Sequence, residues 1–496
     1  LDEAPSETRL LGRAGLIAHE TAHMWFGNLV TMEWFNDVWT KEVFASFMAA
    51  KIVNPSFPDI NHDLQFLVRH YPGAYSVDRT GGANAIRQHL PNLNEAGQMY
   101  GAIIYNKAPV MMRKLEKMIG EDLFRDGMRE YLSTFAFDNA TWPALIEILD
   151  AKSDQNLAIW SDVWVNTPGR DAVRQQWDTP AEGEGGPMRY GLVPSRFNEL
   201  NRWDDLEETE RAALVINLYE QMLAGTGPRA GLYLDQLVLI AEKEQNQLVL
   251  NQVLGQISRV FWNLRPESLR VRDAKLIEQV LWESMHSRQE ASRRKVYFEA
   301  YVDIAFTRDA LEQAYQVWSG EIEIDNLPLA ENDLIDVAQV LAVKMPDRAD
   351  RIVEEQIERT ENPDSVRKLR FIAPSLSPEP EVRNQFFESL ADERNRQTES
   401  WVLDALANLH HPLRITESEK YLLPSLELLS EIQATGDIFF PKRWLDETLG
   451  NHRSSSAVLT VRNFLAERPE YNEQLRMKIL QSAHRLFRAN ELTGAR

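Results

Sequence analysis

Apolar positions in the first third of the chain recur mostly at helical spacing. Between residues 10 and 26 they stand at positions 10, 11, 14, 17, 18, 22, 25 and 26, close to the three- and four-residue spacing of one helical face. The same spacing predicts a second helix over residues 38–53. Thr141 is expected to cap a helix that begins at Trp142, since Pro143 is tolerated in a first turn. Further helices are predicted over about 98–118, 121–135, 142–152 and 156–166.

A stretch rich in glycine, proline and glutamate follows between about residues 167 and 204, and helical periodicity resumes from about 206 to 492. The later helical segments are separated by short turns and show no strict repeat, which is typical of a loosely HEAT-like solenoid. The sequence therefore predicts a mainly α protein. Its expected parts are a domain over 1–170, a linker or reduced β segment over 171–204, and a helical solenoid-like domain over 205–496.

Composition narrows the possible classes of protein. Lysine and arginine number 54 against 75 aspartates and glutamates, and the resulting net charge of -21 is spread along the chain, which argues against nucleic-acid binding. No apolar run approaches the roughly 18 residues of a membrane helix, so a membrane span is excluded. Cysteine is absent, so a disulfide framework is impossible and any metal site must consist of histidines and carboxylates.

Such a set of residues begins at His19-Glu20-x-x-His23, within the first predicted helix. Two histidines four residues apart lie on the same helical face, so both imidazoles can reach one ion. Glu20 projects about 100° round from His19 and points beside the ion. A carboxylate in that place can take a proton from a water molecule that attacks a substrate.

A third ligand is available in Glu42, which follows His23 after 18 residues and lies in the second predicted helix. A helix–loop–helix that brings two histidines and one glutamate to an ion matches the His₂Glu ligand set of catalytic zinc sites, in which water takes the fourth position. The spacing therefore points to metal-assisted hydrolysis.

The residues around these motifs resemble the aminopeptidase N family of zinc metallopeptidases, a branch of the gluzincins. The resemblance rests on the His-Glu-x-x-His segment with Glu42, on the flanking segments 25–31 and 34–39, and on Tyr105-Asn-Lys-Ala. It covers residues 10–170 specifically and the helical remainder more loosely. It implies a thermolysin-like catalytic domain capped by an α-helical domain, and peptides as substrates.

Carried over to this sequence, the resemblance implies that His19, His23 and Glu42 bind one Zn²⁺ per chain. Glu20 is then the general base, and Tyr105 stabilises the oxyanion of the transition state. The expected function is a zinc-dependent aminopeptidase that hydrolyses N-terminal residues from peptides.

Some positions depart from the family pattern. Glu42 lies between Lys41 and Val43, where the family usually has Asn-Glu-Gly, and the carboxylate is kept. Ala49 stands where the family tends to place an acid behind the ligands, so weaker zinc binding is expected unless Asp37 or Glu33 takes that role. The family's Gly-x-Met-Glu-Asn segment, which anchors the substrate amine, is absent, and the chain is expected to lack an N-terminal part of the enzyme.

Other functions stay open on the sequence alone. A related zincin could act as an endopeptidase or an epoxide hydrolase, and a helical scaffold could carry a vestigial metal site. Glu20 counts against the scaffold, because a binding protein has no need of a base.

The eight other histidines show no ligand-like spacing and are expected to be structural. Trp25, Trp34 and Trp39 are expected in the core.

Overall fold

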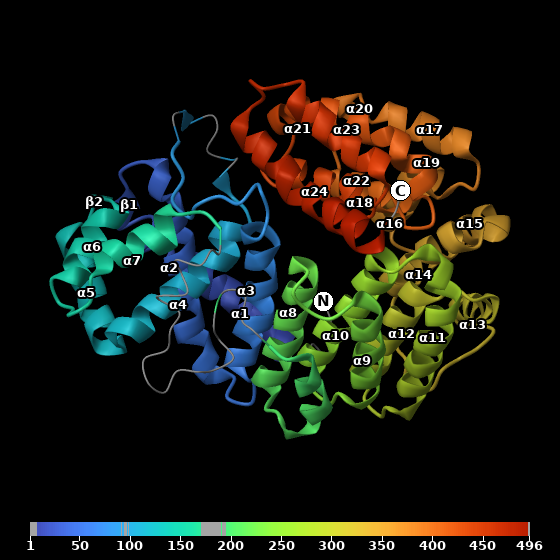
Figure 1. Ribbon diagram of the computed structural model, residues 1–496, viewed down its shortest axis with the longest axis horizontal. Coiled ribbons are helices and arrows are strands. Elements are labelled where there is room, and N and C mark those ends of the chain that lie inside the picture. Colours follow the sequence, from blue (N-terminus) through green and yellow to red (C-terminus); the bar gives the residue numbers. More distant parts are fainter. Residues whose placement is uncertain are drawn as a thin grey trace. The chain divides into compact units, whose positions relative to one another are not determined.

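The computed structural model describes residues 7–90, 92–93, 97, 99–169, 190 and 195–494. The chain folds into two compact units, Leu1–Glu220 and Gln221–Arg496, and helices predominate in both (Figure 1). The mainly α class predicted from the sequence is thus confirmed. Of the predicted linker over 171–204, only residues 190 and 195–204 belong to the described part of the chain.

The first unit combines helices with one small sheet. Strands β1 (Val30–Met32) and β2 (Asp138–Ala140) pair in parallel, with Thr31 opposite Asn139. The helices are α1 (Glu7–Ala22), α2 (Val38–Val53), α3 (His62–Asp78), α4 (Ala108–Ile119), α5 (Glu121–Thr134), α6 (Trp142–Asp150), α7 (Leu157–Ser161) and α8 (Glu208–Ala224), whose last residues enter the second unit.

Helices α1 and α2 pack on each other through small and aliphatic side chains. Leu11 and Ala18 of α1 form a buried cluster with Ala49 and Val53 of α2. Burying these side chains stabilises the pair by roughly 25 cal/mol for each Å² of apolar surface removed from water. Helix α2 spans the predicted residues 38–53. Helix α1 ends at Ala22, four residues before the predicted end, where the chain turns toward β1.

A pair of tryptophans, Trp39 on α2 and Trp142 on α6, lies in the core of the first unit. Trp39 and Trp142 are buried, and their ring centroids lie 4.7 Å apart. Asp37, also buried, accepts hydrogen bonds from Arg87 Nε at 2.6 Å and from the backbone N–H of Trp142 at 3.3 Å. Thr141 caps α6 as predicted, since its hydroxyl accepts a hydrogen bond from the third backbone N–H beyond it, at 3.2 Å.

Helix α3, which the sequence did not predict, packs against a π-helical turn over Ile103–Lys107, named here the π-turn. The Lys107 ammonium and the Asp78 carboxylate form a fully buried ion pair at 2.8 Å between these elements. Tyr190 donates a second hydrogen bond to Asp78 at 2.9 Å. Breaking such a buried pair by removing one partner costs about 3–5 kcal/mol, so the π-turn is firmly held on α3.

The second unit consists of helices joined by short connections. Neighbours pack in pairs, among them α9 with α10, α11 with α12, α14 with α15 and α16 with α18. In the described part of the chain, no helix is both long enough and apolar enough to cross a membrane. The helices are α9 (Ala230–Lys243), α10 (Gln247–Arg259), α11 (Arg270–Ser287), α12 (Ala291–Ile304), α13 (Arg308–Ser319), α14 (Glu331–Lys344), α15 (Ala349–Arg359), α16 (Pro363–Leu376), α17 (Pro380–Ser389), α18 (Glu399–Leu409), α19 (Ile415–Ser418), α20 (Leu422–Glu427), α21 (Leu429–Thr435), α22 (Phe440–Leu449), α23 (Ser455–Ala466) and α24 (Glu473–Thr493).

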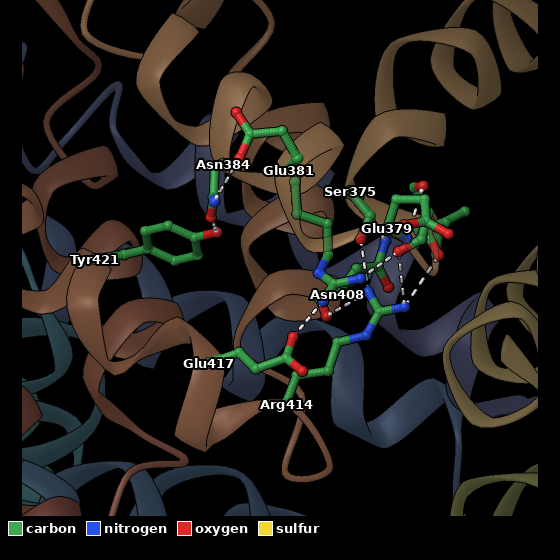
Figure 2. Close-up of polar contacts among 11 residues, drawn as sticks. Ser375, Glu379, Glu381, Asn384, Asn408, Arg414, Glu417 and Tyr421 are labelled. Carbon is green, nitrogen blue, oxygen red and sulfur yellow. Dashed lines mark hydrogen bonds and ion pairs between the residues drawn. The ribbon is translucent and has the colours of Figure 1, made fainter.

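Basic side chains cap several helix C-termini in this unit. Arg414 donates to the carbonyl oxygens of Ser375 at 2.7 Å and Leu376 at 3.0 Å, at the end of α16 (Figure 2). Lys344 donates to Val302 near the end of α12 at 2.8 Å. Similar contacts end α13 through Arg359, α17 through Arg396 and α23 through Arg476. The last carbonyls of a helix lack intrahelical partners and carry partial negative charge, so cationic side chains satisfy them.

Candidate metal centre

The packing of α1 on α2 sets the first two elements of the site side by side. Ala18 is buried against α2, so its neighbour His19 lies at the edge of the contact and faces Glu42 on α2. His23 follows the last residue of α1, and its backbone N–H still bonds the His19 carbonyl at 3.2 Å. The two imidazoles therefore keep helical spacing although the helix itself ends at Ala22.

Three ligand atoms converge at this point. His19 Nε2 lies 3.1 Å from His23 Nε2 and 3.7 Å from Glu42 Oε2. One ligand atom from each of the three residues lies within 4.8 Å of the others, and no other such group occurs in the part of the chain that the structure describes. Ligands held tetrahedrally at about 2.0–2.1 Å from a Zn²⁺ ion stand about 3.3 Å apart. The donor set and its spacing fit this ion.

The second nitrogen of each imidazole has a partner that fixes the ring. His23 Nδ1 lies 3.0 Å from the carbonyl oxygen of Phe26, so this nitrogen carries the hydrogen and Nε2 is left as the ligand atom. Gly27 has a φ of +130°, a value that favours glycine, in the turn that brings this carbonyl back to the ring. His19 Nδ1 lies 3.2 Å from the hydroxyl of Ser46 on α2.

Ser46 was not identified from the sequence. A hydroxyl 27 positions away from a histidine is visible as its partner only once α1 and α2 are packed. Asp37, one of two acids that could have replaced the acid missing at Ala49, is bound by Arg87 and by the backbone N–H of Trp142. Glu33, the other expected residue, is exposed to solvent.

The electrostatics of the site favour a charged Glu42. Its burial raises the pKa of the carboxyl, but the hydrogen bond with His19 and the charges of Lys41 and His23 outweigh burial, so the pKa lies below its ordinary value. Lys41 Nζ stands 3.5 Å from Glu42 Oε1. A carboxylate that is already ionised can bind a cation without losing a proton first.

Glu20 stands apart from the three converging side chains. It follows His19 in α1, about 100° round the helix, and it is exposed to solvent. It does not belong to the group that could hold an ion. The structure therefore separates Glu20 from the candidate ligands, in keeping with the geometry expected from the sequence.

Tyr105 reaches the site from the π-turn. Burial raises the pKa of its phenol, and the Glu42 charge, the Tyr100 phenol and a hydrogen bond with Glu42 raise it further. The charge of Glu20 acts in the same direction. A phenol that keeps its proton is a hydrogen-bond donor at neutral pH. The Tyr100 ring stacks on Tyr105 with a centroid distance of 6.3 Å.

Residues outside this centre adopt structural roles or lie at the surface. His410 Nδ1 lies 2.9 Å from His452 Nε2 inside the second unit, and both rings are buried. The expected burial of the tryptophans holds for Trp39 but is wrong for Trp25 and Trp34, which are 49% and 42% exposed. Trp25 lies beyond the end of α1.

Part of the chain is similar in sequence to known proteins. The sequence profile of the peptidase family M1 domain matches residues 2–164. The chain is 33% identical over 209 residues to a leucyl aminopeptidase of Saccharolobus solfataricus, an alignment that covers 41% of this chain and 25% of that protein. It is 35% identical over 170 residues to the puromycin-sensitive aminopeptidase of Caenorhabditis elegans, covering 34% and 18%. It is 32% identical over 173 residues to an aminopeptidase N of Streptomyces lividans, covering 34% and 20%.

The chain thus spans a quarter or less of the length of these relatives. The match to the family domain lies within the first unit. The matched region contains the three converging side chains, Glu20 and Tyr105. Over its residues 2–164, the chain is similar to the peptidase family M1 domain.

Proposed function

We propose that the chain acts as a zinc-dependent aminopeptidase that removes N-terminal residues from peptides. The observation that carries the proposal is the convergence of His19, His23 and Glu42, with the Tyr105 phenol on Glu42. The names of three similar proteins, all aminopeptidases, support the reaction class. In this proposal residues 1–170 are thermolysin-like and residues 205–496 form a HEAT-like solenoid.

His19, His23 and Glu42 would hold one Zn²⁺ per chain. The bound ion supplies Lewis acidity and lowers the pKa of a bound water toward 7. The Phe26 carbonyl and the Ser46 hydroxyl hold the two imidazoles so that their Nε2 atoms face the ion. The chain thereby orients its ligands before substrate arrives.

Glu20 and Tyr105 carry the proton transfer and the charge stabilisation. The Glu20 carboxylate accepts a proton from the attacking water and returns it to the leaving amine. The Tyr105 phenol donates a hydrogen bond to the oxyanion that develops on the scissile carbonyl. Loss of one such donor typically costs about 10²–10³ in kcat.

Metal content tests the first part of this proposal. The purified full-length protein is expected to contain one Zn²⁺ per chain at neutral pH, measured by plasma mass spectrometry, and His23→Ala is expected to lose it. Less than about half an ion per chain would argue against the metal centre.

The general base is tested separately by Glu20→Gln. This change keeps size and shape but removes the proton acceptor, so kcat/KM on an aminoacyl amide is expected to fall by about 10²–10⁴-fold with zinc retained. Glu121→Gln is the matched control, because that side chain is 81% exposed on α5. Undiminished turnover in Glu20→Gln contradicts the mechanism.

The aminopeptidase assignment is tested with a peptide whose N-terminus is free and the same peptide with an acetylated N-terminus. Equal rates of cleavage of the two peptides contradict the assignment.

A further inference from the structure

Tyr105 lies in an element that differs from a regular helix. The π-turn over Ile103–Lys107 leads directly into α4, with Pro109 in its first turn. Proline has no N–H, and in a regular helix its ring would also clash with the carbonyl four residues earlier, which here belongs to Tyr105. The wider π-turn accommodates Pro109, and π-turns of this kind occur frequently at functional sites.

The Tyr105 carbonyl has a partner on another helix. His70 Nδ1, on α3, lies 3.2 Å from this oxygen. A carbonyl only accepts hydrogen bonds, so Nδ1 must carry the hydrogen. Burial, together with the nearby Arg69 charge, lowers the pKa of His70 to about 4, so the ring is neutral at physiological pH.

The residue after Tyr105 is also fitted to α3. The side chain of Asn106 forms a hydrogen bond with His70. Asn106 Nδ2 would lie only 2.7 Å from a Cβ atom at position 73, where α3 has glycine. The absence of a side chain at Gly73 therefore lets the π-turn approach α3 closely, and Asn106 fills the space.

The end of the π-turn is held by the buried ion pair between Lys107 and Asp78, whose Nζ–Oδ1 distance is 2.8 Å. His70, Gly73 and Asp78 all belong to α3. Three consecutive residues of the π-turn are thus anchored by a single helix.

We infer that His70 is a positioning residue, which holds the backbone of Tyr105 so that its phenol is aimed at the reacting carbonyl. This inference rests on the proposed role of Tyr105. In this arrangement His70 acts through its hydrogen bonds with the Tyr105 carbonyl and the Asn106 side chain. A displacement of about 1 Å at a reacting group can cost about 10²-fold in rate.

The test compares His70→Leu with His70→Asn in the full-length protein, using an aminoacyl amide substrate. Leucine has no donor, so kcat is expected to fall by about 10- to 100-fold while KM stays within about twofold and one Zn²⁺ per chain is retained. The asparagine Nδ2 can donate where His70 Nδ1 did, so His70→Asn is expected to recover most of the lost kcat.

His62→Leu is the matched control. His62 also lies on α3 and contacts backbone carbonyls, those of Asn54 at 3.0 Å and Phe57 at 2.9 Å, both of which precede α3. Its replacement is expected to lower the melting temperature and to leave kcat unchanged. An equal loss of kcat in His62→Leu and His70→Leu would overturn the inference.

A double-mutant cycle with Tyr105→Phe separates positioning from general structural damage. Tyr105→Phe alone is expected to lower kcat by about 10²–10³-fold. Adding His70→Leu to this variant is expected to change kcat less than twofold, because the phenol that His70 positions is gone. Independent, multiplying losses would overturn the inference. Wild-type activity of Tyr105→Phe would instead contradict the proposed function.

Discussion

At the scale of single residues, Ser46 shows how the site depends on a group that touches neither metal nor substrate. Its hydroxyl lies 3.2 Å from His19 Nδ1 and orients the ring toward Glu42. Loss of such a partner typically weakens metal affinity by about 10–100-fold. Ser46→Ala is therefore expected to raise the zinc dissociation constant by this factor, measured by competition with a chromogenic chelator.

The change should leave the fold intact, because alanine is the better helix former within α2. Ser133→Ala serves as the control, since its hydroxyl bonds only the Glu130 carbonyl of its own helix at 3.0 Å. An unchanged zinc affinity in Ser46→Ala would show that the His19 ring is held by other contacts.

At the scale of helices, the capping of C-termini by cations makes a prediction about the second unit. Arg414 bonds two terminal carbonyls of α16, and burial together with the nearby Arg383 charge lowers its pKa to about 10, so it stays charged at pH 7. Arg414→Met keeps the apolar stem but leaves buried carbonyls unpaired. The free energy of unfolding is expected to fall by about 2–4 kcal/mol in urea titrations.

Arg367→Met tests whether the effect belongs to the buried helix end. Arg367 lies on the same helix and pairs with Asp364, but its side chain is 63% exposed. Its replacement is expected to change the free energy of unfolding by less than about 0.5 kcal/mol. Similar losses in both variants would contradict a special role for Arg414.

Helices with a clear apolar period and a sharp stop could be predicted from the sequence. Helix α2 matches its predicted range because its apolar spacing ends at Asn54-Pro55. Helix α3 was missed because Pro72 and Gly73 interrupt its pattern, and contacts with the π-turn offset their helix-breaking tendency. The π-turn itself arises from tertiary contacts that no local pattern specifies.

More of the candidate site than of the surrounding fold could be predicted from the sequence. His19, His23 and Glu42 converge as their spacing along two helices predicted. The ring partners, Ser46 and the Phe26 carbonyl, depend on packing and on the turn at Gly27, which the spacing does not reveal.

At the scale of the whole molecule, the division into two units predicts a local response to metal. An ion that binds only the folded site stabilises that unit by about 2.7 kcal/mol when its free concentration is 100 times the dissociation constant. A chelator is therefore expected to speed amide hydrogen exchange in α1 and α2 of the zinc-loaded protein. Exchange in α16 and α18 should stay constant. Uniform acceleration in both units, or none, would contradict this expectation.

The buried cations of the second unit are part of the charge that dissolved salt screens. Among the described residues of this unit, eight lysine and arginine side chains are buried, compared with three acidic side chains, those of Glu244, Asp273 and Glu278. The basic ones are Arg265, Arg270, Lys344, Arg383, Arg396, Arg414, Arg453 and Lys478. Most of these cations donate to carbonyl oxygens, and all of them count toward the net charge of -21 that dissolved counterions balance. Salt screens this charge over a Debye length of about 8 Å at physiological ionic strength. Repulsion between copies of the chain should therefore weaken steeply as salt is added.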